Sequence, residues 1–212
     1  LSRLRKTRQV IDTKTGTQKT LVEFRDAEIV QEIVENGRRV GEKKMLASVI
    51  KYSDADEGQD LALLMVRKIG MTEKSAVFYD TDNDILPIGT KVFHVGSLHG
   101  QFGANSMTDG IMSQIGRVLN IGSAGGGVVF DQTTVTAFPG SSGGGVYLKK
   151  DARYVGMLVR GAGEGFNLIV PVRRMVDYCE KHKIMWALDK SVAMPTEDEL
   201  KKMPVEHEPK EK

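Results

Sequence analysis

Cysteine is nearly absent from this sequence of 212 residues, and its single copy, Cys179, excludes an internal disulfide framework. The formal net charge is only +2, so overall charge gives no argument for binding to nucleic acid or to an anionic membrane. No apolar run approaches the roughly 20 residues of a membrane-spanning helix, and no signal peptide is visible. With 40% hydrophobic and 27% charged residues, the composition is that of an ordinary soluble globular protein, and we expect no membrane partner.

Metal and cofactor motifs are also lacking. The histidines and the cysteine do not fall at the spacing of zinc ligands. The glycine-rich run GSAGGG (122–127) lacks the strand–loop–helix context and the Gly-Lys-Ser/Thr ending of a phosphate-binding loop, so a hairpin turn explains it better. We therefore expect no cofactor and no bound metal.

Aromatic residues are missing from the basic start of the chain. Residues 1–20 hold six basic side chains against one acidic side chain, Asp12. One interpretation is a basic arm for nucleic acid or another polyanion, and the other is a solvated turn and loop that contacts the core through Leu1 and Leu4. Because no aromatic residue is interleaved for base stacking, the second interpretation is favoured, and we expect no nucleic-acid partner.

Short apolar runs bounded by polar turns dominate the rest of the chain, and many are rich in valine and isoleucine. Such runs, together with 23 glycines and an Asn-Gly pair at 36–37, predict an all-β protein built as a barrel or sandwich. The predicted strands lie within residues 21–30, 44–52, 60–66, 90–96, 110–119, 126–135, 145–150, 153–160 and 166–172.

One segment has the periodicity of a helix. From Pro171, the residues Val172, Met175, Val176 and Cys179 fall on one helical face, and proline is common in a first helical turn. Residues 189–212 are charged and contain proline, which predicts a solvated, flexible tail with a short helix at 197–202.

A glycine- and serine-rich stretch, FPGSSGGGVYL (138–148), lies between two strand-like runs, which favours a turn over a linker. A serine hydroxyl is a poor nucleophile unless a base removes its proton and nearby donors stabilise the oxyanion that forms. Glycines beside a serine let backbone N–H groups converge on one point. The spacing of the pentapeptide GSSGG (140–144) selects Ser142 as the nucleophile, with the amides of Gly140 and Ser142 as the oxyanion hole.

The run TAFPGSSGGGV resembles the nucleophile segment of trypsin-fold serine proteases, especially the HtrA-like branch. Three further stretches resemble segments of that family in the same order. They are ASVIKYSDADEGQDLALLMV (47–66), GTKVFHVGSLHGQFGANSMTDGIMSQIGR (89–117) and YVGMLVRGAGEGFNLIVPV (154–172). The resemblance covers about residues 28–186. The resemblance implies a trypsin-like double β-barrel with a C-terminal helix. It implies a protease domain over residues 1–188, with the two barrels divided near 75–90, followed by the tail at 189–212.

The resemblance also implies roles for single residues. Ser142 matches the nucleophile, and Asp60 matches the carboxylate that orients the catalytic base. The alternative for Asp60 is a solvated aspartate at the start of a strand, like Asp54. Thr136 would lie near the base of the primary specificity pocket, and because it is neutral we expect a small or medium apolar residue before the scissile bond.

The same resemblance implies a peptide or protein substrate. Val159, Arg160 and Gly161 would bind it by backbone hydrogen bonds, as an added antiparallel strand. The expected activity is that of a serine endopeptidase that forms an acyl-enzyme on Ser142, and the family resemblance is compatible with an oligomer.

The catalytic histidine is what the sequence lacks most conspicuously. The family places it before the aspartate, but all four histidines, His94, His99, His182 and His207, follow Asp60 and suit structural or solvated positions. In one explanation the sequence begins just past that histidine, residues 1–7 form the short helical turn that follows it, and the opening strands of the first barrel are missing. In the other, the histidine is truly absent and the protein is a catalytically inactive pseudoprotease, a peptide-binding or structural module.

Overall fold

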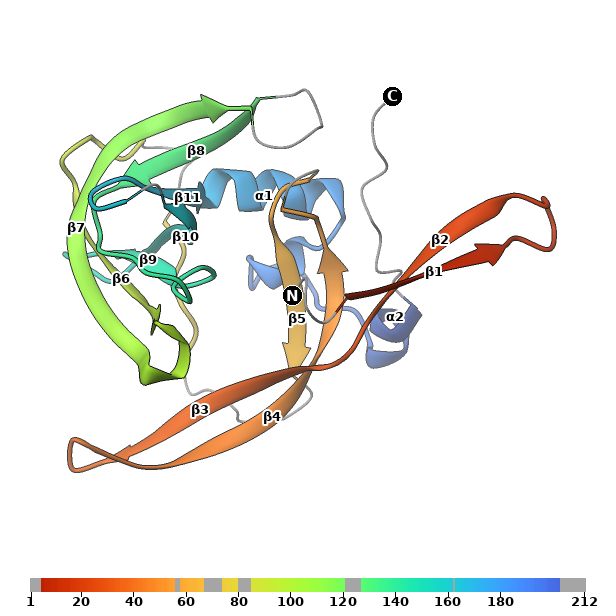
Figure 1. Ribbon diagram of the computed structural model, residues 1–212, viewed down its shortest axis with the longest axis horizontal. Coiled ribbons are helices and arrows are strands. Elements are labelled where there is room, and N and C mark those ends of the chain that lie inside the picture. The colour runs from red at the N-terminus through yellow and green to blue at the C-terminus, as the bar shows by residue number, and fades with distance from the viewer. Residues whose placement is uncertain are drawn as a thin grey trace. The chain divides into compact units, whose positions relative to one another are not determined.

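The computed structural model describes residues 5–55, 58–66, 74–79, 85–120, 127–161 and 163–202. The chain divides into two compact units, Leu1–Glu73 with Pro195–Lys212, and Lys74–Met194. Both units are built mainly of β-strands (Figure 1), which confirms the all-β class expected from the sequence.

The main sheet of the first unit has three antiparallel strands in the order β3-β4-β5, namely β3 (Ala27–Glu35), β4 (Arg38–Tyr52) and β5 (Ala62–Val66). Asn36 and Gly37 join β3 to β4 with φ angles of 50° and 73°, and Glu35 pairs with Arg38 across the turn. Two central residues with positive φ are typical of the type I′ turn that Asn-Gly favours. The predicted hairpin at 36–37 is therefore confirmed.

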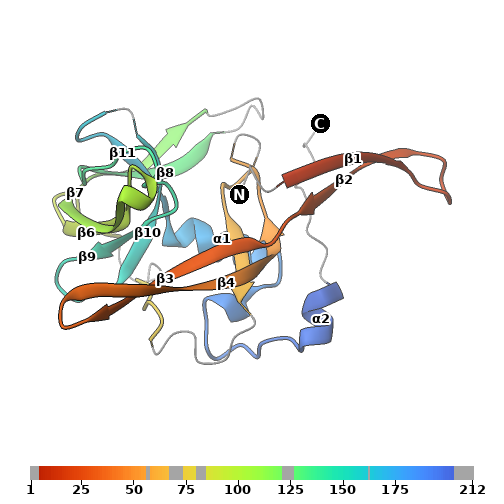
Figure 2. The same cartoon turned by 60° about the horizontal axis from the view of Figure 1, so that its bottom comes forward.

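A second hairpin precedes this sheet in the chain (Figure 2), and two expectations from the sequence were wrong in this region. Strand β1 (Arg5–Ile11) pairs with β2 (Gln18–Phe24), where the sequence suggested a helical turn over 1–7 and a loop beyond it. The single strand expected at 21–30 is instead split between β2 and β3. Residues 1–4, including Leu1 and Leu4, lie outside the described residues.

Side chains of the basic segment take part in this hairpin. The Arg8 guanidinium lies 3.0 Å from the Glu23 carboxylate on the paired strand, and Arg5 donates to Asp54 over 2.8 Å. Asp54, expected to be solvated, is thus half-buried in an ion pair. The absence of a nucleic-acid partner stays a prediction.

The second unit is a closed antiparallel barrel in the order β10-β11-β8-β7-β6-β9. Its strands are β6 (Lys91–Leu98), β7 (Gly103–Leu119), β8 (Val128–Thr133), β9 (Gly145–Leu148), β10 (Tyr154–Gly161) and β11 (Asn167–Pro171), with a 3-10 turn, η2 (Gly100–Phe102), between β6 and β7. Alternate residues of these strands fill the barrel with an apolar core that includes Val92, Met112, Val146, Leu148, Leu158 and Ile169, together with Val135, which follows β8.

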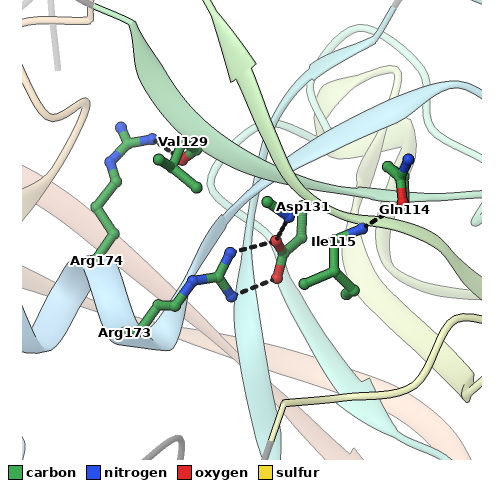
Figure 3. A network of polar contacts seen from close by, with 7 residues as sticks. Gln114, Ile115, Val129, Asp131, Arg173 and Arg174 are labelled. Atoms are coloured by element: carbon green, nitrogen blue, oxygen red, sulfur yellow. Dashed lines mark hydrogen bonds and ion pairs between the residues drawn. The ribbon is translucent and has the colours of Figure 1, made fainter.

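The predicted C-terminal helix is confirmed as α1 (Val172–Lys181), which buries Val172, Met175 and Cys179 on one face. Figure 3 shows how α1 is fixed to the barrel. Arg173 on the helix makes two hydrogen bonds to the buried Asp131 carboxylate of β8, which also accepts from the Gly116 amide. Arg174 donates to the Val129 carbonyl over 3.0 Å.

The chain continues through η3 (Met185–Ala187) to α2 (Glu197–Lys202), the short helix predicted at this position. Helix α2 belongs to the first unit and buries Leu200, whose exposed fraction is 3%. Residues 203–212, with His207, lie outside the described residues. The division into a protease domain at 1–188 and a tail at 189–212 remains a proposal.

Candidate active site

The glycine- and serine-rich stretch forms a compact turn just before β9, as the sequence predicts. The Ser141 amide donates to the Phe138 carbonyl over 2.9 Å, and the Gly144 amide donates to the Ser141 carbonyl over 3.0 Å. The Ser141 side chain faces inward, where its hydroxyl accepts from the Phe138 amide, and its residue is 1% exposed. Ser141 therefore holds the turn together, whereas the next residue, Ser142, is exposed.

Gly140 packs closely against the segment that follows β6. Its φ is 98°, and a β-carbon there would lie 2.6 Å from both the Ser97 carbonyl oxygen and the Gly100 nitrogen. The His99 amide donates to the Pro139 carbonyl over 3.0 Å in the same region. Only glycine can occupy this position without moving the backbone on one side or the other.

The amides predicted to form an oxyanion hole are available. In the part of the chain that the structure describes, neither the Gly140 amide nor the Ser142 amide donates to another protein group, and both residues are exposed. The neighbouring amides are used differently: Ser141 and Gly144 donate within the turn, and Gly143 donates to the Leu158 carbonyl over 2.7 Å. The turn thus leaves free the two donors that the motif assigns to a bound oxygen.

The Ser142 hydroxyl is directed to strand β10. It donates to the Val159 carbonyl over 3.2 Å. The ladder between β10 and β11 shifts register between Leu158 and Arg160, so Val159 is the extra residue of a bulge. A bulge takes a carbonyl out of the regular ladder, which explains why the Val159 carbonyl can accept from Ser142.

Strand β10 is paired over different lengths on its two sides. On one side it pairs with β11 up to Asn167, whereas on the other side the pairing with β9 ends at Met157. Leu158 closes that second ladder by exchanging hydrogen bonds with Gly143 and Gly144 of the turn. The end of β10, beside the nucleophile turn, is the segment to which the sequence predicts that an extended peptide adds as a further strand.

Two further residues are Thr136, which the sequence predicts near the base of the specificity pocket, and Asn167, which pairs with Gly161 on β10. Thr136 is exposed, and its carbonyl accepts from the Thr108 hydroxyl over 2.8 Å. Asn167 is 2% exposed and donates to the Val135 carbonyl over 2.7 Å, and its side-chain oxygen fills the place where a β-carbon of Gly161 would be. The sequence analysis did not single out Asn167. Its position as the one polar residue at the start of the apolar run NLIVP could have indicated it.

Asp60 lies in the first unit, directly before β5. It is half-buried with a φ of 55°, and its amide donates to the Asp54 carbonyl over 3.2 Å. Ser53 closes the loop that holds it, because its amide donates to the Leu61 carbonyl and its hydroxyl accepts from the Gln59 amide. Ser142 belongs to the second unit, so the pairing of Asp60 with the nucleophile remains a proposal.

Three of the four histidines are described, and they occupy different environments. His94 is fully buried within the barrel, and burial lowers the pKa of its imidazole, with a smaller opposing effect from the nearby Ser141 carbonyl. His99 is exposed and its ring lies 4.9 Å from that of Phe138. His182 packs on Tyr178 at the end of α1, with 4.5 Å between ring centroids.

The described residues lack two features of other protein classes. They contain no group of three histidine, cysteine, aspartate or glutamate side chains close enough to bind a metal ion together. Among them, no helix has both the length and the apolar character needed to cross a membrane.

The chain resembles known proteins in fold and in the sequence of one domain family. Two solved structures are similar in fold. The protease domain of MamO from Magnetospirillum magneticum has 22% identity and a TM-score of 0.51, and the match covers 71% of this chain and 75% of that one. The HtrA-type protease AlgW with a decapeptide has 15% identity and a TM-score of 0.56, and the match covers 87% of this chain and 63% of that one. No curated protein sequence matches. The trypsin-like peptidase domain family matches residues 8–157, so the chain belongs to the family of trypsin-like peptidase domains.

Proposed function

We propose that the protein is a serine endopeptidase that cleaves peptide bonds through an acyl-enzyme on Ser142. The observation that carries this proposal is the turn itself. It presents an exposed Ser142 hydroxyl beside two unused amides, those of Gly140 and Ser142, while the buried Ser141 fixes the backbone between them. Such preorganised donors are usually the largest contribution to acyl-transfer catalysis.

The chemistry follows from these groups. A histidine base takes the hydroxyl proton while Oγ of Ser142 bonds to the carbonyl carbon of the substrate, and the carbonyl electron pair moves to the oxygen. The amides of Gly140 and Ser142 stabilise that oxyanion. As the intermediate collapses, the C–N bond breaks and the histidinium returns its proton to the leaving amine. Water then attacks the acyl group by the same route and regenerates the free Ser142 hydroxyl.

Asp60 is proposed to orient the histidine and to stabilise its charged form. Its half-buried position before β5 and its constrained loop support this role. The sequence holds no histidine before Asp60, so the proposal takes the base from a segment preceding Leu1. That histidine would accept the proton that the Ser142 hydroxyl now donates to the Val159 carbonyl.

The proposed substrate is an extended peptide. Its backbone would pair with Val159, Arg160 and Gly161 at the end of β10, beyond Met157, where the pairing with β9 ends. The residue before the scissile bond would enter a pocket near Thr136, whose neutral side chain gives no preference for lysine or arginine. Selection of a small or medium apolar residue is therefore expected.

A second candidate is a non-catalytic peptide-binding module on the same fold. It is favoured by the absence of a histidine before Asp60 and by the Ser142 hydroxyl, which is satisfied by the Val159 carbonyl rather than activated by a base. In this case the same segment of β10 would still bind peptides, but the peptides would leave uncleaved.

Hydrolysis of a peptide library by the full-length protein separates the two candidates. The proposal expects cleavage after small or medium apolar residues, and it expects Ser142→Ala to reduce the rate at least about a thousandfold because the nucleophile is lost. Ser191→Ala, which changes another exposed serine of the second unit, is the matched control and should leave the rate unchanged. Saturable binding of peptides without cleavage would instead support the second candidate.

A further inference from the structure

His94 is a titratable residue that the proposed reaction does not use. It lies in the middle of β6, is fully buried, and pairs with Thr108 on β7 and Val146 on β9. In a strand the residue two positions away shares the same face, so His94 follows the core residue Val92 into the barrel interior. Both of these cross-strand partners are uncharged.

The imidazole of His94 touches the nucleophile turn from inside the barrel. Nε2 occupies the place where a β-carbon of Gly144 would lie, and the Ser141 carbonyl oxygen is 2.9 Å from that same place. On the other side, Cε1 and Nε2 lie 2.5 and 2.7 Å from the position of a β-carbon on Gly96. The two glycines are therefore required by the ring, which fills the space between β6 and the turn.

Among the described residues, no charged group is paired with this imidazole. Neither Nδ1 nor Nε2 has a hydrogen bond of good geometry within the described part of the chain. The Ser141 carbonyl is the nearby acceptor; it raises the pKa of His94 slightly, against the larger lowering caused by burial. A buried imidazolium without a counter-ion is strongly unfavourable, so the ring is held neutral in the folded barrel.

The other titratable groups around β6 lie away from the ring. Asp109 on β7 and Lys149 after β9 form an exposed ion pair with each other. Tyr147 on β9 stacks on Phe93, which points to the opposite side of β6 from His94. His99 contacts the turn from outside, through Phe138.

We propose that His94 is a positioning residue for the nucleophile turn: its neutral imidazole supports the backbone from Ser141 to Gly144, and its protonation displaces that backbone. The consequence for catalysis rests on the proposed function, but the coupling between ring and turn does not. A proton on His94 makes both ring nitrogens donors. Two carbonyls lie near Nε2, those of Val95 and Ser141, at 2.6 and 2.9 Å from the β-carbon position of Gly144. Val95 is paired with both neighbouring strands of the barrel, and the Ser141 carbonyl already accepts from Gly144. Hydrating or pairing the charged ring therefore requires the turn to move.

The direction of the pH dependence follows from the burial of the ring. Because the pKa of His94 is lowered in the folded protein, the ordered turn is fully stable above the ordinary histidine pKa of about 6.5. It loses stability as the pH falls below that value, since the displaced state takes up the proton more readily. The turn should thus be ordered at neutral pH and open in acid.

Amide NMR of the full-length protein tests the coupling directly. Between pH 7.5 and 5, we expect the resonances of Ser142, Gly143 and Gly144 to shift together with the imidazole of His94, with a midpoint below 6.5. In His94→Gln, which keeps a hydrogen-bond donor without a titratable charge, this shift should vanish. It should persist in His182→Gln, the distant control, and in His99→Gln, which removes the histidine outside the turn.

A wild-type titration in which the turn amides do not follow His94 overturns the proposal without any variant, and so does persistence of their shift in His94→Gln. The rate at which a fluorophosphonate labels Ser142 adds the catalytic consequence. At pH values below the pKa of His94 and the pKa of the catalytic histidine, the labelling rate of the wild type should fall about a hundredfold per pH unit, one factor of ten for each histidine. The labelling rate of His94→Gln should fall only about tenfold per pH unit. Absence of all labelling contradicts the proposed function but leaves the NMR result intact.

Discussion

Replacing Gly140 with alanine places a methyl group between two backbone segments. The β-carbon would lie 2.6 Å from the Ser97 carbonyl oxygen and 2.6 Å from the Gly100 nitrogen, and neither contact can be relieved by rotating a side chain. The φ of 98° is also unfavourable for any residue with a β-carbon. Gly143 is the matched control, because its φ is 91° in the same turn but nothing lies within 4 Å of its β-carbon position.

The two substitutions separate backbone strain from steric overlap. Strain at a positive φ costs about 1–3 kcal/mol and applies to both variants. Overpacking against fixed backbone costs a further 1–3 kcal/mol or so, and applies to Gly140→Ala alone. The smaller entropy of the unfolded chain after a glycine-to-alanine change is common to both and cancels. Gly140→Ala should therefore be less stable than Gly143→Ala by about 1–3 kcal/mol.

Urea unfolding measures this difference, with Trp186, the single tryptophan, reporting on the second unit that contains the turn. The free energy of unfolding should decrease in both variants and more in Gly140→Ala. Equal values for the two variants would refute the close packing of Gly140 against the segment after β6.

Three other features give measurable outcomes. Arg173→Met should lower the free energy of unfolding by about 2–3 kcal/mol, because it leaves the buried Asp131 carboxylate with fewer hydrogen-bond donors. A decrease of less than half this amount would contradict the role of the Arg173–Asp131 pair in fixing α1. Burial raises the pKa of Cys179 to about 11, so roughly 0.1% of its side chain is thiolate at pH 8. A disulfide reagent should therefore react with Cys179 only after urea unfolding, and rapid reaction of the native protein would argue against the packing of α1. The hydrogen bond from Lys149 and the positive charge of Lys149 lower the pKa of the Asp109 carboxyl. In an NMR titration, Lys149→Ala should therefore raise the pKa of Asp109 towards its ordinary value, and an unchanged pKa would rule out the ion pair.

The parts of the fold that local sequence determines could be predicted. Asn36 and Gly37 accept positive φ at low cost and so define their hairpin. The helical periodicity from Val172 to Cys179 identified α1, and the glycines flanking Ser142 marked a turn between strands. In each case the conformation depends on residues that are close neighbours in the chain.

The parts that depend on distant partners could not be predicted. Strand β1 has the largely polar sequence RKTRQVI, and it is a strand because β2 supplies its hydrogen bonds. The position of His94 inside an apolar strand suggested a structural residue, but its contact with Gly144 arises only when β9 is placed beside β6. The positive φ of Asp60 likewise comes from the loop closed by Ser53, and nothing in the run DLALL indicates it.

Mass spectrometry of the full-length protein after treatment with a fluorophosphonate tests the central claim, that Ser142 is an activated nucleophile. The account predicts one phosphonyl adduct per chain, located by peptide mapping on Ser142, absent in Ser142→Ala and much slower to form in Asp60→Asn. A folded protein that forms no adduct, or forms one on another serine, would contradict it.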